Sequence, residues 1–241
     1  MEGLQKIVVH EQDRKLFWLL LQQKFLTLEL ILGQFAAHEL ALPPNKRGYY
    51  QRLRRLVRWG YLRIAHYQGR TKVYILSQLG WEALPEEQRH KLPLIQPDDM
   101  TTMRHDLIAA ELRFYLESLG GTEWSADREF RQYAAQIVCN PDGAFTFQGK
   151  DYLIEVELSQ KSRERYDALA QVYTNLQGPD AVLYFFENDE VIAYLKEQVA
   201  EHQAIAFFRL DTPLPPPQEM QGWYQGRPIT FAAFLNMGSQ A

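Results

Sequence analysis

Apolar residues in the first ninety positions follow a helical period in some segments and a strand-like alternation in others. The helical period has a spacing near 3.6 residues, and the alternation places apolar residues at every second position. These patterns predict helices over 10–23, 26–36 and about 46–59, strands over 61–66 and 71–76, and a further helix that begins near residue 76. Thr27 and Asn45 are placed to cap the second and third helices. Gly60 can end the third helix, and Gly69 suits a turn between the strands.

From residue 101 the pattern changes to helices and strands that alternate along the chain. It predicts helices over 102–119, 160–176 and 189–201, and strands near 128–138, 143–147, 151–158, 181–186 and 205–209. The polar, Pro-containing stretch before residue 101 is typical of a linker, and residues 214–218 include a short polyproline segment. We therefore predict a domain at 1–90, a linker at 91–100, a second domain at 101–210 and a Pro-rich C-terminal tail at 211–241.

The composition is ordinary for a soluble protein, with 46% of the 241 residues hydrophobic and 23% charged. No apolar run approaches the roughly 20 residues that a membrane-spanning helix needs, so no membrane association is expected. The amino terminus lacks the basic, apolar and small-residue order of a secretion signal. Cys139 is the single cysteine, which excludes an intramolecular disulfide and a cysteine-rich zinc site. We expect a cytoplasmic location.

The net charge of -4 conceals a division between the two parts of the chain. Residues 1–90 hold 14 Lys and Arg against 8 Asp and Glu, whereas the remaining residues hold 12 against 22. Residues 40–81 alone carry nine basic residues and no acidic one. Such a concentration of positive charge is typical of a surface that binds a polyanion.

The basic residues gather on the third predicted helix and on the hairpin that follows it. At about 100° per residue, Tyr49, Leu53 and Leu56 fall on one face and leave the arginines on the flank and the solvent side. The acidic partners at i±3 or i±4 that a merely solubilising face includes are missing. Uncompensated guanidinium groups are suited to contact phosphates and to read guanine. We predict that double-stranded DNA is the partner and that it contacts Lys46, Arg47, Arg54, Arg55, Arg58, Arg70 and Lys72.

This order of helices and strands resembles the winged helix-turn-helix family. Residues 76–84, Leu-Ser-Gln-Leu-Gly-Trp-Glu-Ala-Leu, match the ending L-[ST]-x-x-G-x-x-A-L that is common in that family. The resemblance implies that the third helix enters the major groove and that Arg70 and Lys72 meet the DNA backbone. The alternative is a winged helix used for protein contacts, which leaves the basic face unexplained. Winged-helix proteins often pair on palindromic DNA, so a homodimer stays open.

Carboxylates stand at informative places in the second predicted domain. Asp142 follows Pro141 at the entrance to a strand, and Glu155 and Glu157 project from one face of the next strand. Glu111 lies inside an apolar run of the preceding helix. Ionised carboxylates on a central strand are costly unless something compensates them, and a divalent cation is one such partner. A bound cation could activate water and stabilise charge at a phosphodiester.

At these residues the sequence resembles the PD-(D/E)xK nuclease superfamily, which has the order αβββαβ. The resemblance implies that Asp142 and Glu155 are Mg²⁺ ligands and that Glu111 is an auxiliary carboxylate. Glu157 stands where the family has its catalytic lysine, and Lys161 could serve as a relocated lysine. Two alternatives stay open: the fold is retained without catalysis, or the strand carboxylates are bridged to Arg163 or Arg165. The expected fold class is thus α+β with two domains, a winged helix and a restriction-endonuclease-like domain.

A further resemblance spans both predicted domains. A winged helix followed by Arg104-His105-Asp106-Leu107, Pro141-Asp142-Gly143 and Glu155–Leu158 with Lys161, Ser162, Arg165 and Tyr166 is similar to the replication-relaxation family of plasmids and integrative elements. This resemblance implies a role in replication, mobilisation or DNA processing, with other replication or transfer proteins as partners. Two alternative functions stay open, namely an active Mg²⁺-dependent DNA endonuclease and a winged-helix transcriptional regulator.

Overall fold

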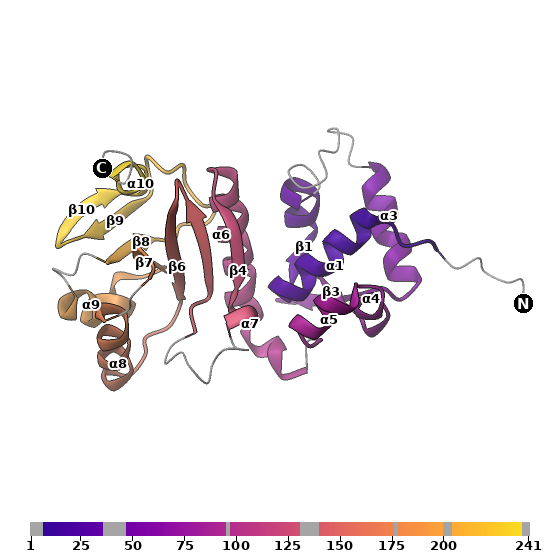
Figure 1. The fold of residues 1–241 in the computed structure, drawn as a ribbon, viewed down its shortest axis with the longest axis horizontal. Coiled ribbons are helices and arrows are strands. Elements are labelled where there is room, and N and C mark those ends of the chain that lie inside the picture. The colour runs from indigo at the N-terminus through magenta and orange to yellow at the C-terminus, as the bar shows by residue number, and fades with distance from the viewer. Residues whose placement is uncertain are drawn as a thin grey trace, which may run out of the picture. The chain divides into compact units, whose positions relative to one another are not determined.

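The computed structural model describes residues 7–35, 47–94, 97–130, 140–175, 178–199 and 204–237. It divides into two compact units, Met1–Phe114 (unit 1) and Tyr115–Ala241 (unit 2) (Figure 1). Both units combine helices with a sheet, which confirms the predicted α+β class. Within the described ranges, no helix combines the length and the apolar character that crossing a membrane requires.

Unit 1 follows the predicted order of elements closely. Its elements are α1 (Glu11–Gln23), β1 (Leu26–Thr27), a π-helical segment (Leu30–Phe35), α3 (Arg47–Arg58), β2 (Leu62–Tyr67), β3 (Thr71–Leu76), α4 (Gln78–Glu82), α5 (Glu86–Lys91), a 3-10 segment (Pro97–Thr102) and most of α6 (Met103–Ser118). The predicted helices over 10–23 and 46–59 and both predicted strands are confirmed to within a residue or two. Asn45, the predicted cap of α3, lies outside the described residues.

The predicted helix over 26–36 is wrong at its start, because the chain first forms a strand there. β1 pairs antiparallel with β3, with Leu26 opposite Tyr74 and Thr27 opposite Val73, so that the sheet order is β1-β3-β2. The Thr27 hydroxyl then accepts the backbone N–H of Leu30 at 3.2 Å, as expected of a capping residue. Burial of Leu26 against distant residues outweighs its local helical pattern.

The core of unit 1 extends beyond the boundary predicted at residue 90. Leu92 is fully buried, and its carbonyl accepts the indole N–H of Trp81 at 3.2 Å. Met103 and Leu107 of α6 pack with Phe25, Val73 and Ile75 of the sheet region. The described residues of the predicted linker, 91–94 and 97–100, include the last residue of α5 and most of the 3-10 segment, and the boundary between the two units falls within α6.

The motif at residues 76–84 has a direct structural explanation. The Ser77 hydroxyl accepts the backbone N–H of Gly80 at 3.1 Å and donates to the carbonyl of Tyr61 at 2.8 Å, so it caps α4 and attaches it to the residue just before β2. A Cβ atom at position 80 would lie 2.3 Å from the same Tyr61 carbonyl oxygen. Only glycine allows this close approach.

Unit 2 is built around a seven-stranded mixed sheet. Its elements after α6 are β4 (Thr122–Ala126), α7 (Asp127–Phe130), β5 (Gly143–Phe147), β6 (Lys150–Glu157), α8 (Arg163–Thr174), β7 (Ala181–Phe186), α9 (Asp189–Gln198), β8 (Ile205–Arg209), β9 (Gln221–Tyr224), β10 (Arg227–Thr230) and α10 (Phe231–Met237). The strand order is β10-β9-β8-β7-β6-β5-β4. The three central strands β6, β7 and β8 run parallel, and the outer pairs are antiparallel.

Helices cover both faces of this sheet (Figure 1). On one face, Tyr166 and Tyr173 of α8 and Leu195 of α9 pack on alternate residues of the central strands. On the other face, Phe231 and Phe234 of α10 contact aromatic rings of β6, β7 and β8. Because successive strand residues point to opposite faces, Glu155 and Glu157 of β6 project toward the side that carries α8 and α9.

Two predictions for this part of the chain are wrong. The strand expected near 128–138 begins earlier, as β4, and residues 127–130 form α7, whose Glu129 carboxylate accepts the backbone N–H of Ala126 at 2.9 Å. Residues 131–139, with Cys139, lie outside the described residues. The tail expected at 211–241 instead adds β9, β10 and α10 to the fold, because Phe231 and Phe234 are buried against the sheet. The other predicted elements are confirmed, and β7 and β8 have the predicted bounds.

Candidate nucleic-acid interface and acidic site

The outer face of α3 carries most of the basic residues predicted to bind DNA. Tyr49, Leu53 and Leu56 are buried in the core of unit 1, which turns the opposite side of the helix to solvent. The exposed basic residues on that side are Arg47, Arg54, Arg55 and Arg58. Lys46, the remaining predicted contact near this helix, lies outside the described residues. The structure therefore presents four of the predicted contacts on a single helix.

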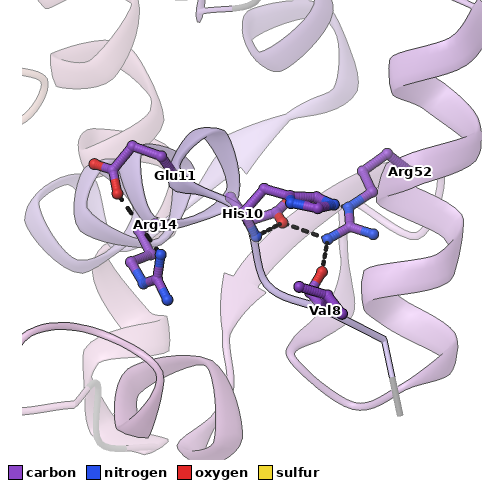
Figure 2. Close-up of polar contacts among 6 residues, drawn as sticks. Val8, His10, Glu11, Arg14 and Arg52 are labelled. Carbon is purple, nitrogen blue, oxygen red and sulfur yellow. Dashed lines mark hydrogen bonds and ion pairs between the residues drawn. The ribbon is translucent and has the colours of Figure 1, made fainter. Parts of the chain in front are cut away.

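Arg52 belongs to α3 but has a structural role (Figure 2). Its Nε donates to Asp13 Oδ1 at 3.0 Å, and its Nη2 contacts the second carboxylate oxygen of Asp13 and the carbonyl of Val8. Asp13 is 1% exposed and also accepts the backbone N–H of His10 at 2.7 Å. This pair attaches α3 to the start of α1, so Arg52 fixes the helix that presents the other arginines.

The hairpin of β2 and β3 presents the remaining predicted contacts. Gln68 and Gly69 form its turn with φ values of 50° and 72°, a left-handed conformation that suits a tight hairpin. Arg70 and Lys72 follow the turn and are exposed. Lys72 pairs across the strands with His66, which is also exposed and was not among the predicted contacts. The tip of this hairpin is thus basic on both strands.

Several of these basic groups have no acidic partner within the described part of the chain. Arg52 and Arg14 each form an ion pair with a carboxylate. By contrast, among the described residues no ion pair is formed by the exposed side chains of Arg54, Arg55, Arg58, Arg70 and Lys72. Positive charge without local compensation attracts a polyanion most strongly at low ionic strength.

In unit 2, Asp142 is held at the start of β5 by the backbone of β6. Its backbone N–H donates to the carbonyl of Ile154 at 2.8 Å, and its Oδ2 accepts the N–H of Val156 at 2.7 Å. A Cβ atom at the following residue, Gly143, would lie 2.6 Å from the ring of Trp124. The Pro-Asp-Gly sequence therefore places the Asp142 carboxylate beside β6 and leaves room for the indole.

Glu155 is buried beside this carboxylate. Its side chain accepts a hydrogen bond from the hydroxyl of Tyr173, which is itself buried on α8. Burial raises the pKa of Glu155 to about 8, and the negative charge of Asp142 adds to this increase. The Tyr173 hydrogen bond and the positive charge of Lys161 act in the opposite direction. Asp142 and Lys161 therefore both act electrostatically on Glu155.

Glu157 and Lys161 form an ion pair at the end of β6. Glu157 is 3% exposed, whereas 22% of the Lys161 side chain is accessible. The backbone N–H of Lys161 donates to the hydroxyl of Tyr166 at 3.1 Å, and this hydroxyl donates to the carbonyl of Val191 at 2.6 Å. The ammonium group of Lys161 is thus held next to Glu157. A relocated catalytic lysine would need such a position beside the acidic residues.

The other residues predicted for this site have different surroundings. Glu111 lies on the part of α6 that belongs to unit 1, and burial raises its pKa. The guanidinium of Arg163 lies 5.3 Å from the centre of the Tyr194 ring. Arg165 is exposed on the first turn of α8. The ion-paired partner of Glu157 is therefore Lys161, in place of the arginines considered from the sequence.

The arrangement has some of the features that a divalent cation requires. Within the described ranges, no group of three or more His, Cys, Asp or Glu residues is placed to hold a metal ion. Asp142 nevertheless lies near enough to Glu155 for its negative charge to raise the pKa of Glu155, and a bound cation would relieve this repulsion. Mg²⁺ commonly binds proteins through one or two carboxylates and keeps several waters. Asp142 and Glu155 would be the two carboxylates of such a site.

The remaining motif residues have roles within the fold. Asp106, in the Arg-His-Asp-Leu motif, accepts hydrogen bonds from Lys24 Nζ at 2.9 Å and from the Thr102 hydroxyl at 2.6 Å. Lys24 and Asp106 are both almost fully buried. Ser162 caps α8 by accepting the backbone N–H of Arg165 at 3.3 Å. These residues connect α6 to α1 and fix the start of α8.

Sequence reasoning missed Tyr173, the hydroxyl that contacts Glu155. A signal for it exists, because Tyr166 and Tyr173 are seven residues apart on a helix and therefore share a face. Both side chains are 1% exposed, and both hydroxyls reach groups of the acidic site or its surroundings.

Comparison with known proteins identifies no relative: no family model matches the chain, and no significant similarity to a curated protein or a solved structure is found.

Proposed function

We propose that this chain is a DNA-binding protein of a plasmid or other mobile element, acting in replication, mobilisation or DNA processing. The observation that carries the proposal is the row of exposed arginines on α3, together with Arg70 and Lys72 on the adjacent hairpin. Among the described residues, Arg54, Arg55 and Arg58 have no carboxylate partner, although Arg52 of the same helix has one. A face used only for solubility would include such partners.

The arrangement of unit 1 supports a winged helix as the DNA-binding element. Three helical segments precede a hairpin, and β1 extends the hairpin to a three-stranded sheet. In this proposal α3 lies in the major groove, and Arg54 and Arg58 contact phosphates or guanine edges. The basic hairpin tip holds the backbone beside it. The resemblance to the replication-relaxation family supplies the mobile-element part of the proposal.

The proposal predicts a strong dependence of DNA binding on salt. Each phosphate contact releases about one counterion, so log Kd should rise with log salt concentration with a slope of about 4–6 for the basic residues named above. We would measure the Kd for a duplex of about 20 base pairs by fluorescence anisotropy between about 50 and 300 mM KCl. A slope below about 1, or no binding at the lowest salt concentration, would contradict the proposal. Binding restricted to one short operator would instead favour a transcriptional regulator.

The acidic site of unit 2 supports a second candidate function, Mg²⁺-dependent cleavage of DNA. Asp142 and Glu155 would hold the cation, which when bound would supply Lewis acidity toward a phosphodiester. Lys161 would lie next to them and contribute the positive charge that Glu157 cannot provide. The observation favouring this function is the proximity of Asp142, Glu155 and Lys161. The ion pair between Lys161 and Glu157 is equally suited to a domain that keeps this fold without catalysis.

A nicking assay separates an active nuclease from an inactive nuclease-like domain. If the site is active, supercoiled plasmid should be nicked in 5 to 10 mM Mg²⁺ or Mn²⁺, on the order of what catalytic metal sites need. Asp142→Ala and Lys161→Met should each lower the rate at least about 100-fold. Asp211→Ala, which removes an exposed carboxylate elsewhere in unit 2, should leave it unchanged. Equal nicking by the Asp142→Ala protein would assign the activity to a contaminant and reject this function.

A further inference from the structure

A cavity of about 460 Å³ opens on unit 2, away from the residues considered so far. It lies between α9 and the strands β8 and β9, with the turn between β9 and β10 at its rim. Its apolar wall includes Ile205 and Phe207, which are buried, and Trp223, which is 44% exposed. Trp223 is one of the few large apolar side chains in the described part of the chain with such exposure. This volume is typical of sites for small organic ligands.

The cavity already contains a position that stabilises an ammonium group. Lys196 Nζ lies 4.8 Å from the centre of the Phe186 ring and 5.3 Å from that of Trp223. The same nitrogen donates to Asp189 Oδ1 at 2.8 Å. Two aromatic faces and a carboxylate around a cation form the geometry by which proteins recognise ammonium ligands. In this protein the chain's own lysine shows that the position favours a positive charge.

The charges around the cavity also favour a cation. Asp189 neutralises Lys196, and Glu197 then adds a further carboxylate to the lining. Among the described residues, the Glu197 side chain makes no hydrogen bond or ion pair. Residues 115–241 as a whole hold 9 Lys and Arg against 18 Asp and Glu, so the surrounding field attracts cations and repels anions.

We propose that this cavity binds a small organic cation with a planar aromatic ring system. The ring system lies against Trp223 and Phe207, and its positive charge faces Glu197. The planar surfaces of the two side chains suit stacking, and the cation gains from both the carboxylate and the indole face. This site is separate from the DNA-binding proposal and does not depend on it.

Proflavine, a three-ring aromatic cation, is a suitable probe, and anthracene-9-carboxylate is its anionic counterpart of similar shape. Binding to the full chain without DNA would be followed by fluorescence anisotropy and calorimetry. We expect proflavine to bind with a micromolar Kd, and the anion at least about tenfold more weakly. Trp223→Ala and Glu197→Gln should each weaken proflavine binding about five- to tenfold. Glu219→Gln, which removes an exposed carboxylate outside the cavity, is the matched control.

The outcomes that overturn this assignment are specific. Absence of proflavine binding at 1 mM, roughly a thousand times the expected Kd, would reject the site. Equal affinity for the anion, or for the Glu197→Gln protein, would show that no cation is recognised. Circular dichroism would show whether the variants fold, and Glu197→Gln alters only an exposed side chain, so it keeps the test decisive.

Discussion

Reversing two charges on α3 should nearly abolish DNA binding. In the Arg54→Glu/Arg58→Glu variant, two cations become two anions on the face proposed to lie in the major groove. We expect Kd to rise about 100-fold or more at 0.1 M salt, because two phosphate contacts are lost and repulsion replaces them. The salt slope should fall by about 2. Both residues are exposed, so the fold should be unaffected.

A control variant tests whether the loss of DNA binding depends on where the charges are reversed or only on the change in net charge. Lys15→Glu/Arg227→Glu changes the net charge equally at two exposed residues, one on α1 and one on β10. We expect it to weaken binding no more than about threefold, through the general field alone. If the control variant lost as much affinity as the α3 variant, α3 would not be the contact surface. Unchanged affinity in the α3 variant would reject the docking proposal itself.

The second large effect concerns the stability of unit 2 and its dependence on pH. Burial and the charge of Asp142 raise the pKa of Glu155 to about 8 from an ordinary value of 4.5. A raised pKa in the folded state means that the folded protein holds the proton more tightly than the unfolded chain does. The associated stability is therefore fully present below pH 4.5 and is lost as the pH rises toward 8.

Replacing the Glu155 carboxyl by an amide should remove this loss of stability at high pH. Glutamine keeps an oxygen that accepts the Tyr173 hydroxyl, but it has no charge to desolvate. We expect Glu155→Gln to leave stability almost unchanged at about pH 5 and to raise it by about 3 to 4 kcal/mol at pH 8. Urea denaturation of both proteins across this range gives the difference directly. Glu219→Gln, at an exposed carboxylate, should show no such trend.

A pH-independent difference between the Glu155→Gln protein and the wild type would mean that Glu155 is ionised and compensated in the folded state. The same experiment bears on the proposed metal. Mg²⁺ held by Asp142 and Glu155 should stabilise the wild type at pH 8, since a ligand that binds only the folded state shifts the equilibrium toward it. The same Mg²⁺ concentration should stabilise the Glu155→Gln protein less.

The sequence predicted best those elements whose local pattern agrees with their tertiary surroundings. The run Ala181–Phe186 is apolar at every position and forms a strand buried on both faces. α3 was placed correctly because its apolar stripe and its closing glycine agree. β1 could not be predicted in this way, because Leu26 and Thr27 become a strand only by pairing with residues almost fifty positions later.

The error at the C-terminal end has a different cause. Gln68-Gly69, Gln148-Gly149 and Gln225-Gly226 all form hairpin turns with positive φ at both residues. The strands on both sides of the first two turns were predicted from the sequence, but the third turn follows a polyproline segment and was assigned to a tail. The same dipeptide between Trp223-Tyr224 and Arg227 was the signal that could have predicted β9 and β10.

The candidate sites were predictable in part for similar reasons. Exposed arginines on α3 follow directly from helical spacing, and alternation along β6 predicts that Glu155 and Glu157 share a face. Contacts between residues that are far apart in the sequence cannot be inferred from the spacing of residues within one element. The contact of Tyr173 with Glu155, and the position of Lys196 between Phe186 and Trp223, depend on how α8 and α9 pack on the sheet.

The two outer strands of the unit 2 sheet also bear on aggregation. β10 carries Arg227 and Pro228, and proline has no N–H to offer a further strand. At the other side, the register of β4 shifts between Thr122 and Ser125, and Glu123 has a φ of 55°. Such irregularity interrupts the row of donors and acceptors that an incoming strand would need. Neither edge is therefore a good template for fibril-like addition of a second copy, even though the strands between them are strongly apolar.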